Sequence, residues 1–323
     1  MKRTSKSLIA AAFLTLGCMN IAAAESSYPN RPIKVIVPFT AGSTTDIVAR
    51  AITEKIGRSL GQVLVIDNRG GASGTIGAAA TASAAPDGYT IMIQSSSHTV
   101  NPSTFAKLPF DTLKDFTAVA PIATLPNALV ISPKKNIKTL QALLDKGRHE
   151  PGKLNYASAG QGSATHLNAE KFRMAAKLDA SNIPFKGSAE AINEVLAGRV
   201  DYYFSPIAPV ISQIKEGHLL ALAVGSEKRS AVLPNVPTTA EAGVANSEFN
   251  FWIGMFASSK VPKEIVERLN KEVLSALSDP EVKQRFASLG AEPWALSSSE
   301  FNAYINSEMK SNAALVKAAG LSP

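Results

Sequence analysis

Hydrophobic positions along the chain alternate between the spacing of buried strands and that of helices. Residues 34–39 form an almost unbroken apolar run, and from Thr44 to Leu60 apolar residues recur at helical spacing. Residues 63–66 and 89–93 are further strand-like runs, and a helix of small residues is expected between them at 70–85. Repeated strand–helix–strand order predicts an α/β protein with mainly parallel sheets.

The same alternation restarts in the middle of the chain. A short strand at 154–157 is followed by a glycine-containing turn and a helix from about Ser163 to Ala176. Later elements are expected at 183–185, 189–197, 201–204 and 219–224. The C-terminal part is predicted to be helical because apolar residues form one stripe there: Ile265, Leu269, Val273, Leu274 and Leu277.

Two extended segments, residues 119–131 and 249–257, are placed to carry the chain between its two halves. They predict two α/β lobes joined by two crossover strands, with a ligand cleft between the lobes. Lobe 1 then comprises residues 25–125 and 252–323, and lobe 2 comprises residues 126–251.

Residues 1–24 have the features of an export signal. Three basic residues among the first six precede a short apolar run, which ends in Ala22–Ala24. The run is shorter than the roughly 20 apolar residues of a membrane helix, although an uncleaved anchor is the alternative. Cleavage near Ala24 predicts a protein of the periplasm.

Charge and cysteine content narrow the classes of function. The formal net charge of +7 falls to +4 without the three basic residues of the signal. No basic stripe is interleaved with aromatic residues, so nucleic-acid binding is not expected. The one cysteine, Cys18, lies within the signal, where lipid attachment is the alternative to removal. The mature chain is then expected to lack disulfides and cysteine nucleophiles.

The first candidate binding turn precedes the helix expected from Thr44. Ser43, with Asp46 three residues later, fits a capping box, although Thr44 is an alternative cap. Free backbone N–H groups and the helix dipole then suit an anion at the carboxyl end of a strand. An ordinary strand-to-helix turn is the alternative, and a bulky side chain at Gly42 is expected to obstruct the turn. The candidate residues are Phe39, Thr40, Ala41, Gly42, Ser43 and Thr44.

A matching turn precedes the helix from Ser163 in the second half. Its glycines allow a ligand to approach the backbone, and its hydroxyl groups add donors. Two such turns, one from each lobe, are suited to hold the two ends of a dicarboxylate. The candidate residues are Ala157, Ser158, Gly160, Gly162, Ser163 and Thr165.

Weaker candidates lie after other strands. Ser96 and His98 follow the strand at 89–93 and are expected at the same sheet edge, unless they belong to a polar loop. Lys186 and Gly187 precede a helix, where Lys186 meets either a carboxylate or water. Trp252, near the second crossover, lines the cleft or belongs to the core.

Signatures of catalysis and metal binding are sparse. Gly71–Gly74 lacks the full nucleophile elbow, although a Ser/His/Asp arrangement remains an alternative. The histidines show no metal-ligand spacing. They are His98, His149, His166 and His218. We therefore expect no metal, no cofactor and no enzyme activity.

Several short motifs follow one another along the mature chain. They are Tyr28–Ile33, Pro38–Asp46, Ala49–Arg50, Asp67–Arg69, Ala85–Thr90, Leu113–Phe116, Asn155–Leu167, Phe185–Ser188 and Leu233–Thr238. In these motifs the chain resembles the Bug-type extracytoplasmic solute receptors of tripartite tricarboxylate transporters. The resemblance covers essentially the whole mature chain.

The resemblance implies a type II periplasmic-binding-protein fold that closes on its ligand. In that family, ligand carboxylates are held by the turns after the first strand of each lobe, largely through backbone groups and ordered water. Here those turns are Phe39–Thr44 and Ala157–Thr165. The family often has two adjacent glycines in the first turn, whereas here Gly42 is followed by Ser43. Family ligands include di- and tricarboxylates, amino acids and aromatic acids.

We therefore expect a monomeric periplasmic receptor that captures a small organic acid, either a di- or tricarboxylate or an aromatic carboxylate. Its partner would be the membrane permease of a tripartite transporter. Two alternatives remain from the sequence. One is a secreted hydrolase that uses serine and histidine of the cleft, and the other is a receptor that reports its ligand to a membrane sensor.

Overall fold

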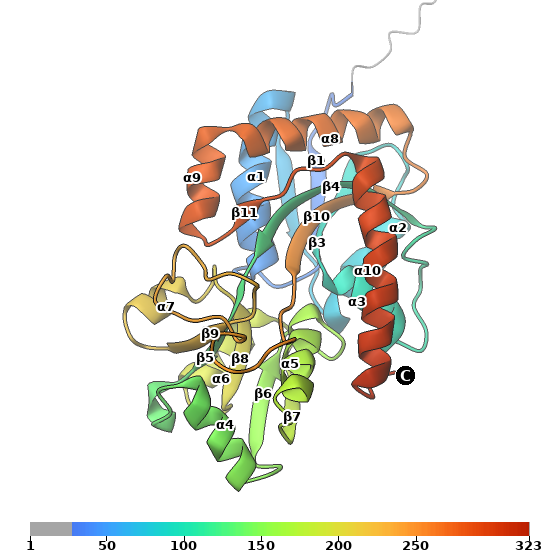
Figure 1. Ribbon diagram of the computed structural model, residues 1–323. Coiled ribbons are helices and arrows are strands. Elements are labelled where there is room, and N and C mark those ends of the chain that lie inside the picture. Colours follow the sequence, from blue (N-terminus) through green and yellow to red (C-terminus); the bar gives the residue numbers. More distant parts are fainter. Residues whose placement is uncertain (1–27, 323) are drawn as a thin grey trace, which may run out of the picture.

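The computed structural model describes residues 28–322 as two α/β lobes, one above the other in Figure 1. The expected signal, residues 1–24, lies outside the described residues. Each lobe contains its own sheet, and the architecture confirms the expected two-lobe α/β fold. Within the described part of the chain, no helix has both the length and the apolar character of a membrane span.

The first lobe is built on a six-stranded sheet in the order β11-β4-β10-β3-β1-β2. Its strands are β1 (Ile33–Val37), β2 (Leu64–Asn68), β3 (Thr90–Ser95), β4 (Phe116–Leu125), β10 (Phe251–Ser258) and β11 (Glu292–Pro293). β1 pairs in parallel with β2 and β3, whereas β10 lies antiparallel between β3 and β4. The sheet is therefore mixed, which corrects the expectation of mainly parallel sheets.

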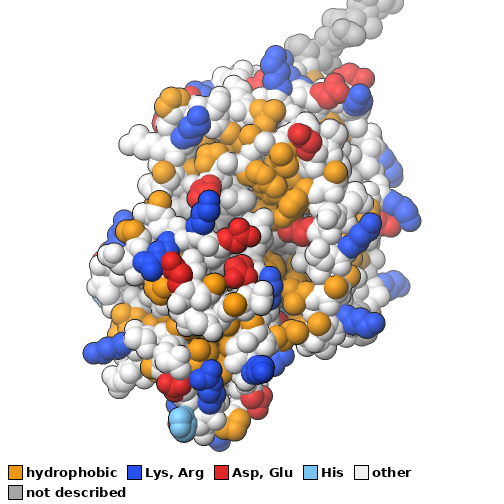
Figure 2. Space-filling model, viewed as in Figure 1, with side chains coloured by type: hydrophobic (Ala, Val, Ile, Leu, Met, Phe, Trp, Pro, Cys, Tyr) orange, Lys and Arg blue, Asp and Glu red, His pale blue; other side chains and the backbone are white. Residues whose placement is uncertain are grey.

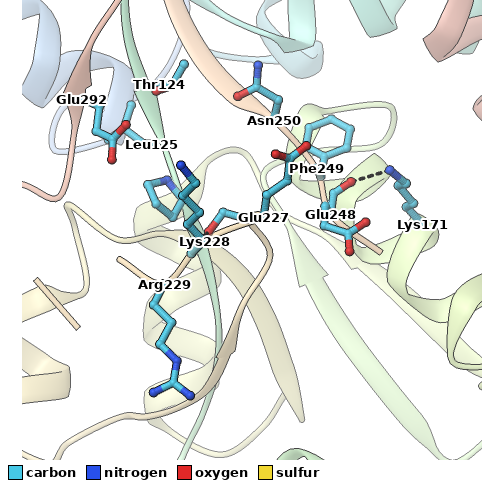
Figure 3. Close-up of a pocket in the computed structure, with 12 residues that line it drawn as sticks. Thr124, Leu125, Lys171, Glu227, Lys228, Arg229, Glu248, Phe249, Asn250 and Glu292 are labelled. Carbon is cyan, nitrogen blue, oxygen red and sulfur yellow. Dashed lines mark hydrogen bonds between the residues drawn. The ribbon is translucent and has the colours of Figure 1, made fainter. Parts of the chain in front are cut away.

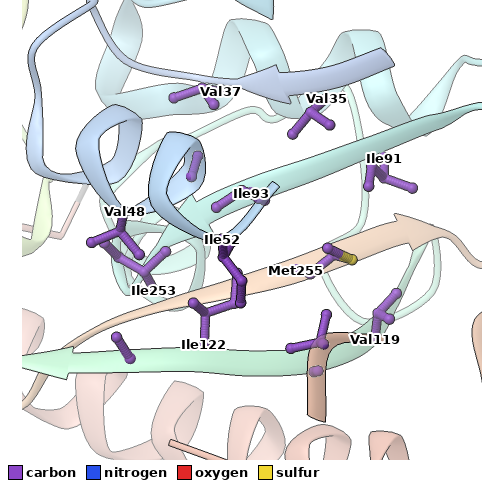
Figure 4. Close-up of a cluster of buried hydrophobic side chains, with 14 of the residues drawn as sticks. Val35, Val37, Val48, Ile52, Ile91, Ile93, Val119, Ile122, Ile253 and Met255 are labelled. Atoms are coloured by element: carbon purple, nitrogen blue, oxygen red, sulfur yellow. The ribbon is translucent and has the colours of Figure 1, made fainter. Parts of the chain in front are cut away.

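Helix α1 shows how sequence periodicity builds the core of this lobe. Val48, Ile52 and Ile56 recur every four residues, so they lie on one face of the helix, and all three are buried. This face packs over the sheet with aliphatic residues of β1, β3, β4 and β10 (Figure 4). Gly61 ends the helix in the left-handed conformation, at φ +65°.

The other helices of the first lobe pack around this sheet. They are α2 (Thr75–Ala82), α3 (Ser97–Thr104), α8 (Lys263–Ser278), α9 (Pro280–Ser288) and α10 (Ser298–Ala318), beside α1 (Thr44–Leu60). The long C-terminal helix α10 packs along α3 (Figure 1). The helix expected at 70–85 is shorter, because Gly71 and Gly74 adopt φ +120° and +90° and a 3-10 turn at Ala72–Gly74 precedes α2.

The second lobe contains a five-stranded sheet in the order β7-β6-β8-β5-β9. Its strands are β5 (Asn127–Ile131), β6 (Leu154–Ser158), β7 (Ala180–Pro184), β8 (Tyr202–Pro206) and β9 (Leu220–Val224). Its helices are α4 (Leu140–His149), α5 (Ala164–Ala175), α6 (Ser188–Leu196) and α7 (Ile211–Lys215), with a 3-10 turn at Pro133–Lys135. Separate apolar clusters fill the two sides of this sheet.

The chain crosses between the lobes twice, and the two crossings are adjacent. The first is Pro126, between the end of β4 and the start of β5. The second lies at 249–250, just before β10, where Phe251 is paired with Leu125 of β4. Phe249 N–H donates to the carbonyl of Gly225 at 2.9 Å, and Gly225 N–H donates to the carbonyl of Asn127 at 2.7 Å, so Gly225 links the two crossings.

The close contact between β10 and α10 yields a stability prediction. A Cβ added at Gly254 would lie 2.5 Å from Cζ of Phe301, whose side chain is fully buried. We expect Gly254→Ala to lower the free energy of unfolding by about 1–3 kcal/mol through overpacking. Chemical denaturation of the wild type and the variant measures this difference in the free energy of unfolding. Phe301→Leu in the Gly254→Ala background is the control and should recover part of the loss, whereas an unchanged stability of Gly254→Ala would contradict the packing.

Candidate functional site

A small cavity lies between the lobes, where the ends of strands meet the starts of helices. Its volume is about 10 Å³, which is about the room that one water molecule needs. Its lining residues are Phe39, Ser43, Thr44, Thr45, Ser95, Ser97, Ala159, Ser163, Thr165, Ser188 and Phe251. Among them are the first residues or caps of α1, α3, α5 and α6, and no charged side chain is among them.

The start of α1 is held by side chains that leave some of its N–H groups free. Ser43 Oγ accepts from Asp46 N–H at 3.3 Å, which confirms Ser43 as the N-cap. The N–H groups of Thr44 and Thr45 make no hydrogen bond within the described part of the chain. Thr44 Oγ1 is also buried without a partner there. These groups are available to an acceptor in the cavity.

Asp46 stabilises the same turn but does not complete a capping box. Its carboxylate accepts from the N–H of Gly42 at 2.9 Å and from Asn68 Nδ2 at 3.0 Å, and it pairs with Arg50 at 2.9 Å. Burial raises the pKa of Asp46, but the hydrogen bonds from Arg50, Gly42 and Asn68 outweigh burial and hold the pKa below its usual range. Asp46 is therefore ionised, and Arg50 compensates its charge.

The start of α5 has the same construction in the second lobe. Ser163 Oγ accepts from His166 N–H at 3.2 Å, and Thr165 Oγ1 accepts from Ala159 N–H at 3.0 Å. His166 Nδ1 accepts from Gly162 N–H at 3.0 Å, so the imidazole is held as an acceptor within the turn. The N–H of Thr165 makes no hydrogen bond within the described residues.

Helix α6 contributes a third start at the cavity. Ser188 is its first residue and lines the cavity, and Ser188 Oγ accepts from the hydroxyl of Tyr203 at 3.1 Å. The N-terminal ends of α1, α5 and α6 thus surround one small space. Helix N-termini carry partial positive charge and unpaired N–H donors, so the site suits an anion although no cationic side chain lines it.

The structure places five of the predicted residues in the cavity wall: Phe39, Ser43, Thr44, Ser163 and Thr165. Thr40, Gly160, Gly162 and Gly187 lie beside it, where the lobes touch. Ala157 and Ser158 are buried in β6, and Ser96 is buried before α3. Ala41 is exposed, and Lys186 lies at an outer pocket of about 310 Å³ at the edge of the interface.

Two expectations are wrong. His98 does not face the cleft: its ring is fully buried among Phe110, Phe116 and Phe256, because helix α3 turns it into the aromatic core. Gly42 is exposed, and an added Cβ would meet nothing within 4 Å, so a larger side chain does not obstruct the turn. Its φ of +77° favours glycine, so a substitution there would strain the backbone instead.

Six cavity residues were not named individually as candidates, although most lie in or next to segments that were predicted: Thr45, Ser95, Ala159, Ser97, Ser188 and Phe251. Ser95 and Ser97 belong to the serine run at the end of β3. Within this run Ser96 and His98 were the expected site residues, whereas Ser95 and Ser97 line the cavity. Phe251 lies in the predicted crossover at 249–257, but its place in the cavity wall depends on the tertiary fold. Trp252, its neighbour, is fully buried in the aromatic cluster, and its indole N–H donates to Glu308.

A much larger pocket, about 600 Å³, lies beside the crossings (Figure 3). Thr124–Pro126 and Glu248–Asn250 line it, together with the loop at 226–229 and with Lys171 and Glu292. Its acidic and basic side chains are mixed, as they are across this face of the molecule (Figure 2). No group of three potential metal ligands occurs within residues 28–322.

The buried histidines yield a pH prediction. Burial lowers the pKa of His98 to about 3 and that of His166 to about 4. Below about pH 6.5 the unfolded chain therefore binds more protons than the folded protein. The contribution of the two neutral histidines to the free energy of unfolding is fully present above this pH and is lost as the pH falls toward 3–4. Denaturation of wild type and His98→Phe at pH 7 and pH 5 measures the effect. Wild type should lose about 2 kcal/mol more than the variant, and equal losses would contradict the assignment.

Comparison with known proteins relates this architecture to transport receptors. The profile of the tripartite tricarboxylate transporter family receptor matches residues 48–321. Protein BugT of Bordetella pertussis is 35% identical over 317 residues, which cover 97% of each chain. An R. palustris protein solved with adipate has a TM-score of 0.89 at 33% identity, covering 92% of this chain and 99% of its own.

A second solved structure, MatC from Rhodopseudomonas palustris with bound malate, has a TM-score of 0.84 at 32% identity. The alignment covers 90% of this chain and 100% of MatC. Family profile, relatives and structures agree with the motifs noted in the sequence. The chain belongs to the tripartite tricarboxylate transporter receptor family.

Proposed function

We propose that this protein is a periplasmic receptor that binds a small dicarboxylate between its lobes and delivers it to a tripartite transporter. The observation that carries the proposal is the convergence of three helix N-termini, those of α1, α5 and α6, on one small cavity between the lobes. Neutral hydroxyls and backbone N–H groups supply its donors, which suits carboxylates at the helix ends.

The relatives favour a dicarboxylate over the other organic acids. Adipate and malate, the molecules bound in the two R. palustris proteins, both carry two carboxylates. In this chain, α1 belongs to one lobe and α5 and α6 to the other, so two carboxylates have separate anchors. The first anchor consists of the free groups of Thr44 and Thr45, and the second of those around Thr165 and Ser188.

The proposed lobes are residues 25–125 with 252–323, and residues 126–251. Hinge motion at Pro126 and at the paired segment before Phe251 would open and close the cleft between them. The ligand would favour the closed form, because only that form brings the two anchors together. Adjacent crossings support this hinge, since they leave the lobes covalently connected on one side.

The receptor proposal is supported over the hydrolase by the surroundings of the histidines. No histidine ring nitrogen hydrogen-bonds a serine hydroxyl within residues 28–322. His166 uses Nδ1 to accept from Gly162, and both ring nitrogens of His98 lack partners.

We propose further that residues 1–24 direct export to the periplasm, that the mature chain is monomeric, and that its partner is the membrane permease.

Ligand binding is tested by thermal denaturation with adipate, malate and their monocarboxylate counterparts hexanoate and lactate. A ligand at 100 times its Kd should add about 2.7 kcal/mol of stability. We expect a dicarboxylate to raise the Tm more than its monocarboxylate counterpart and to be recovered chemically unchanged. Conversion of the ligand would favour the hydrolase instead. A larger shift with each monocarboxylate would contradict the two-anchor site.

The α1 anchor is tested by Thr44→Val, which removes a hydroxyl that makes no hydrogen bond in the described protein. We expect the Kd for the bound dicarboxylate to rise by about tenfold, because a hydrogen bond to a charged group is lost. Thr112→Val is the matched control, since Thr112 Oγ1 is also buried without a partner but lies outside the cavity wall. Calorimetric titration measures both, and equal Kd values for the two variants would contradict the assignment.

A further inference from the structure

The two lobes touch directly through a set of contacts between their own residues. Three glycines of the second lobe lie against hydroxyl side chains of the first: Gly160 against Ser73, Gly162 against Thr104 and Gly187 against Thr40. A Cβ at these glycines would lie 2.8, 2.3 and 2.7 Å from the three hydroxyl oxygens, respectively. Atoms are essentially never that close, so the glycines permit this approach.

Two hydrogen bonds accompany the glycine contacts. Ser73 Oγ donates to the carbonyl of Gln161 at 2.5 Å, close to the outer pocket. Ser97 Oγ accepts from Ala164 N–H at 2.9 Å, within the buried interface. This second bond engages an N–H at the start of α5, so a group of the first lobe already occupies one donor of the binding site.

We propose that these contacts form a clasp that closes the lobes in the absence of ligand. The clasp consists of Gly160, Gly162 and Gly187 with Ser73, Thr104, Thr40 and Ser97, and of the two hydrogen bonds. All its members are groups of the protein, so no ligand atom takes part in these contacts. Glycine at the three positions sets how closely the lobes approach.

The clasp has a consequence for ligand capture, and this consequence rests on the proposed function. The closed cavity has room for about one water molecule. A dicarboxylate is larger, so it enters only after the clasp has opened. The fraction of open protein then limits the association rate, and the clasp lowers the apparent affinity by the same fraction.

Gly187 offers the cleanest test because its backbone is extended, with φ −178°. Any residue adopts this conformation, so Gly187→Ala adds a steric contact without backbone strain. Gly160 and Gly162 are less suitable, since their φ angles of +121° and +72° favour glycine. Thr40→Ala is the compensating change, because it removes the facing Oγ1, which makes no hydrogen bond in the described protein.

The experiment measures the distance between the lobes in ligand-free protein by spin labelling. Labels are attached at Lys107→Cys and Ser181→Cys, exposed sites on opposite lobes, in a Cys18→Ser background. Wild type should populate the short, closed distance. Gly187→Ala should lower the ratio of closed to open protein by about tenfold, and Gly187→Ala with Thr40→Ala should restore it.

Ser97→Ala provides an independent arm, since it removes the acceptor of Ala164 N–H and should also favour the open distance. Only open distances in ligand-free wild type would overturn the clasp. So would an unchanged distribution in Gly187→Ala, or failure of Thr40→Ala to restore closure. The measurement contains no ligand, so its outcome is separate from whether an organic acid binds; that is decided by the thermal shifts.

Discussion

Helices α1, α5 and α6 begin at a buried boundary between lobes, and this is the constraint on which the rest of the structure depends. The first N–H groups of a helix lack partners within it, and burial makes an unpaired donor costly. Ser43 and Ser163 satisfy one donor each, and Asp46 stabilises the turn before α1. The donors that remain, at Thr44, Thr45 and Thr165, face a space between the lobes. An acceptor there would contact both lobes at once, which is why the proposed function couples binding to closure.

Electrostatic compensation keeps this site receptive to an anion. Asp46 would oppose a bound carboxylate, but Arg50 pairs with it outside the cavity wall. His166 stays neutral because burial lowers its pKa, and its Nδ1 is committed to Gly162. The cavity therefore offers directional neutral donors rather than a free charge. Such donors select the geometry of a ligand more than its net charge, which agrees with a family whose solved members hold acids of different length, adipate and malate.

The sequence predicted the elements whose signals are local. The apolar spacing of α1 and the N-cap role of Ser43 depend on neighbouring residues only, and both were predicted correctly, whereas the capping box with Asp46 does not form because its carboxylate accepts from Gly42 instead. His98 was misplaced because the strand after Thr90 gives way to α3 at Ser97, and the helix turns the ring into the core. Ser188 and Phe251 lie in segments that the sequence singled out, but their cavity roles depend on how distant segments meet and have no local signal. Likewise, the sheets are mixed because β10 returns from the other lobe and inserts antiparallel between β3 and β4, and because β5 lies antiparallel between β8 and β9.

The central claim is that backbone N–H groups at the helix starts hold the ligand. Amide chemical shifts measured by NMR during titration with adipate or malate test it most directly. The account predicts that the amide protons of Thr44, Thr45 and Thr165 move downfield together, at one saturating ligand concentration, as they gain a charged acceptor. Binding that leaves these three amides unmoved, with shifts confined to Ser226 and Asn250 of the pocket beside the crossings, would contradict it.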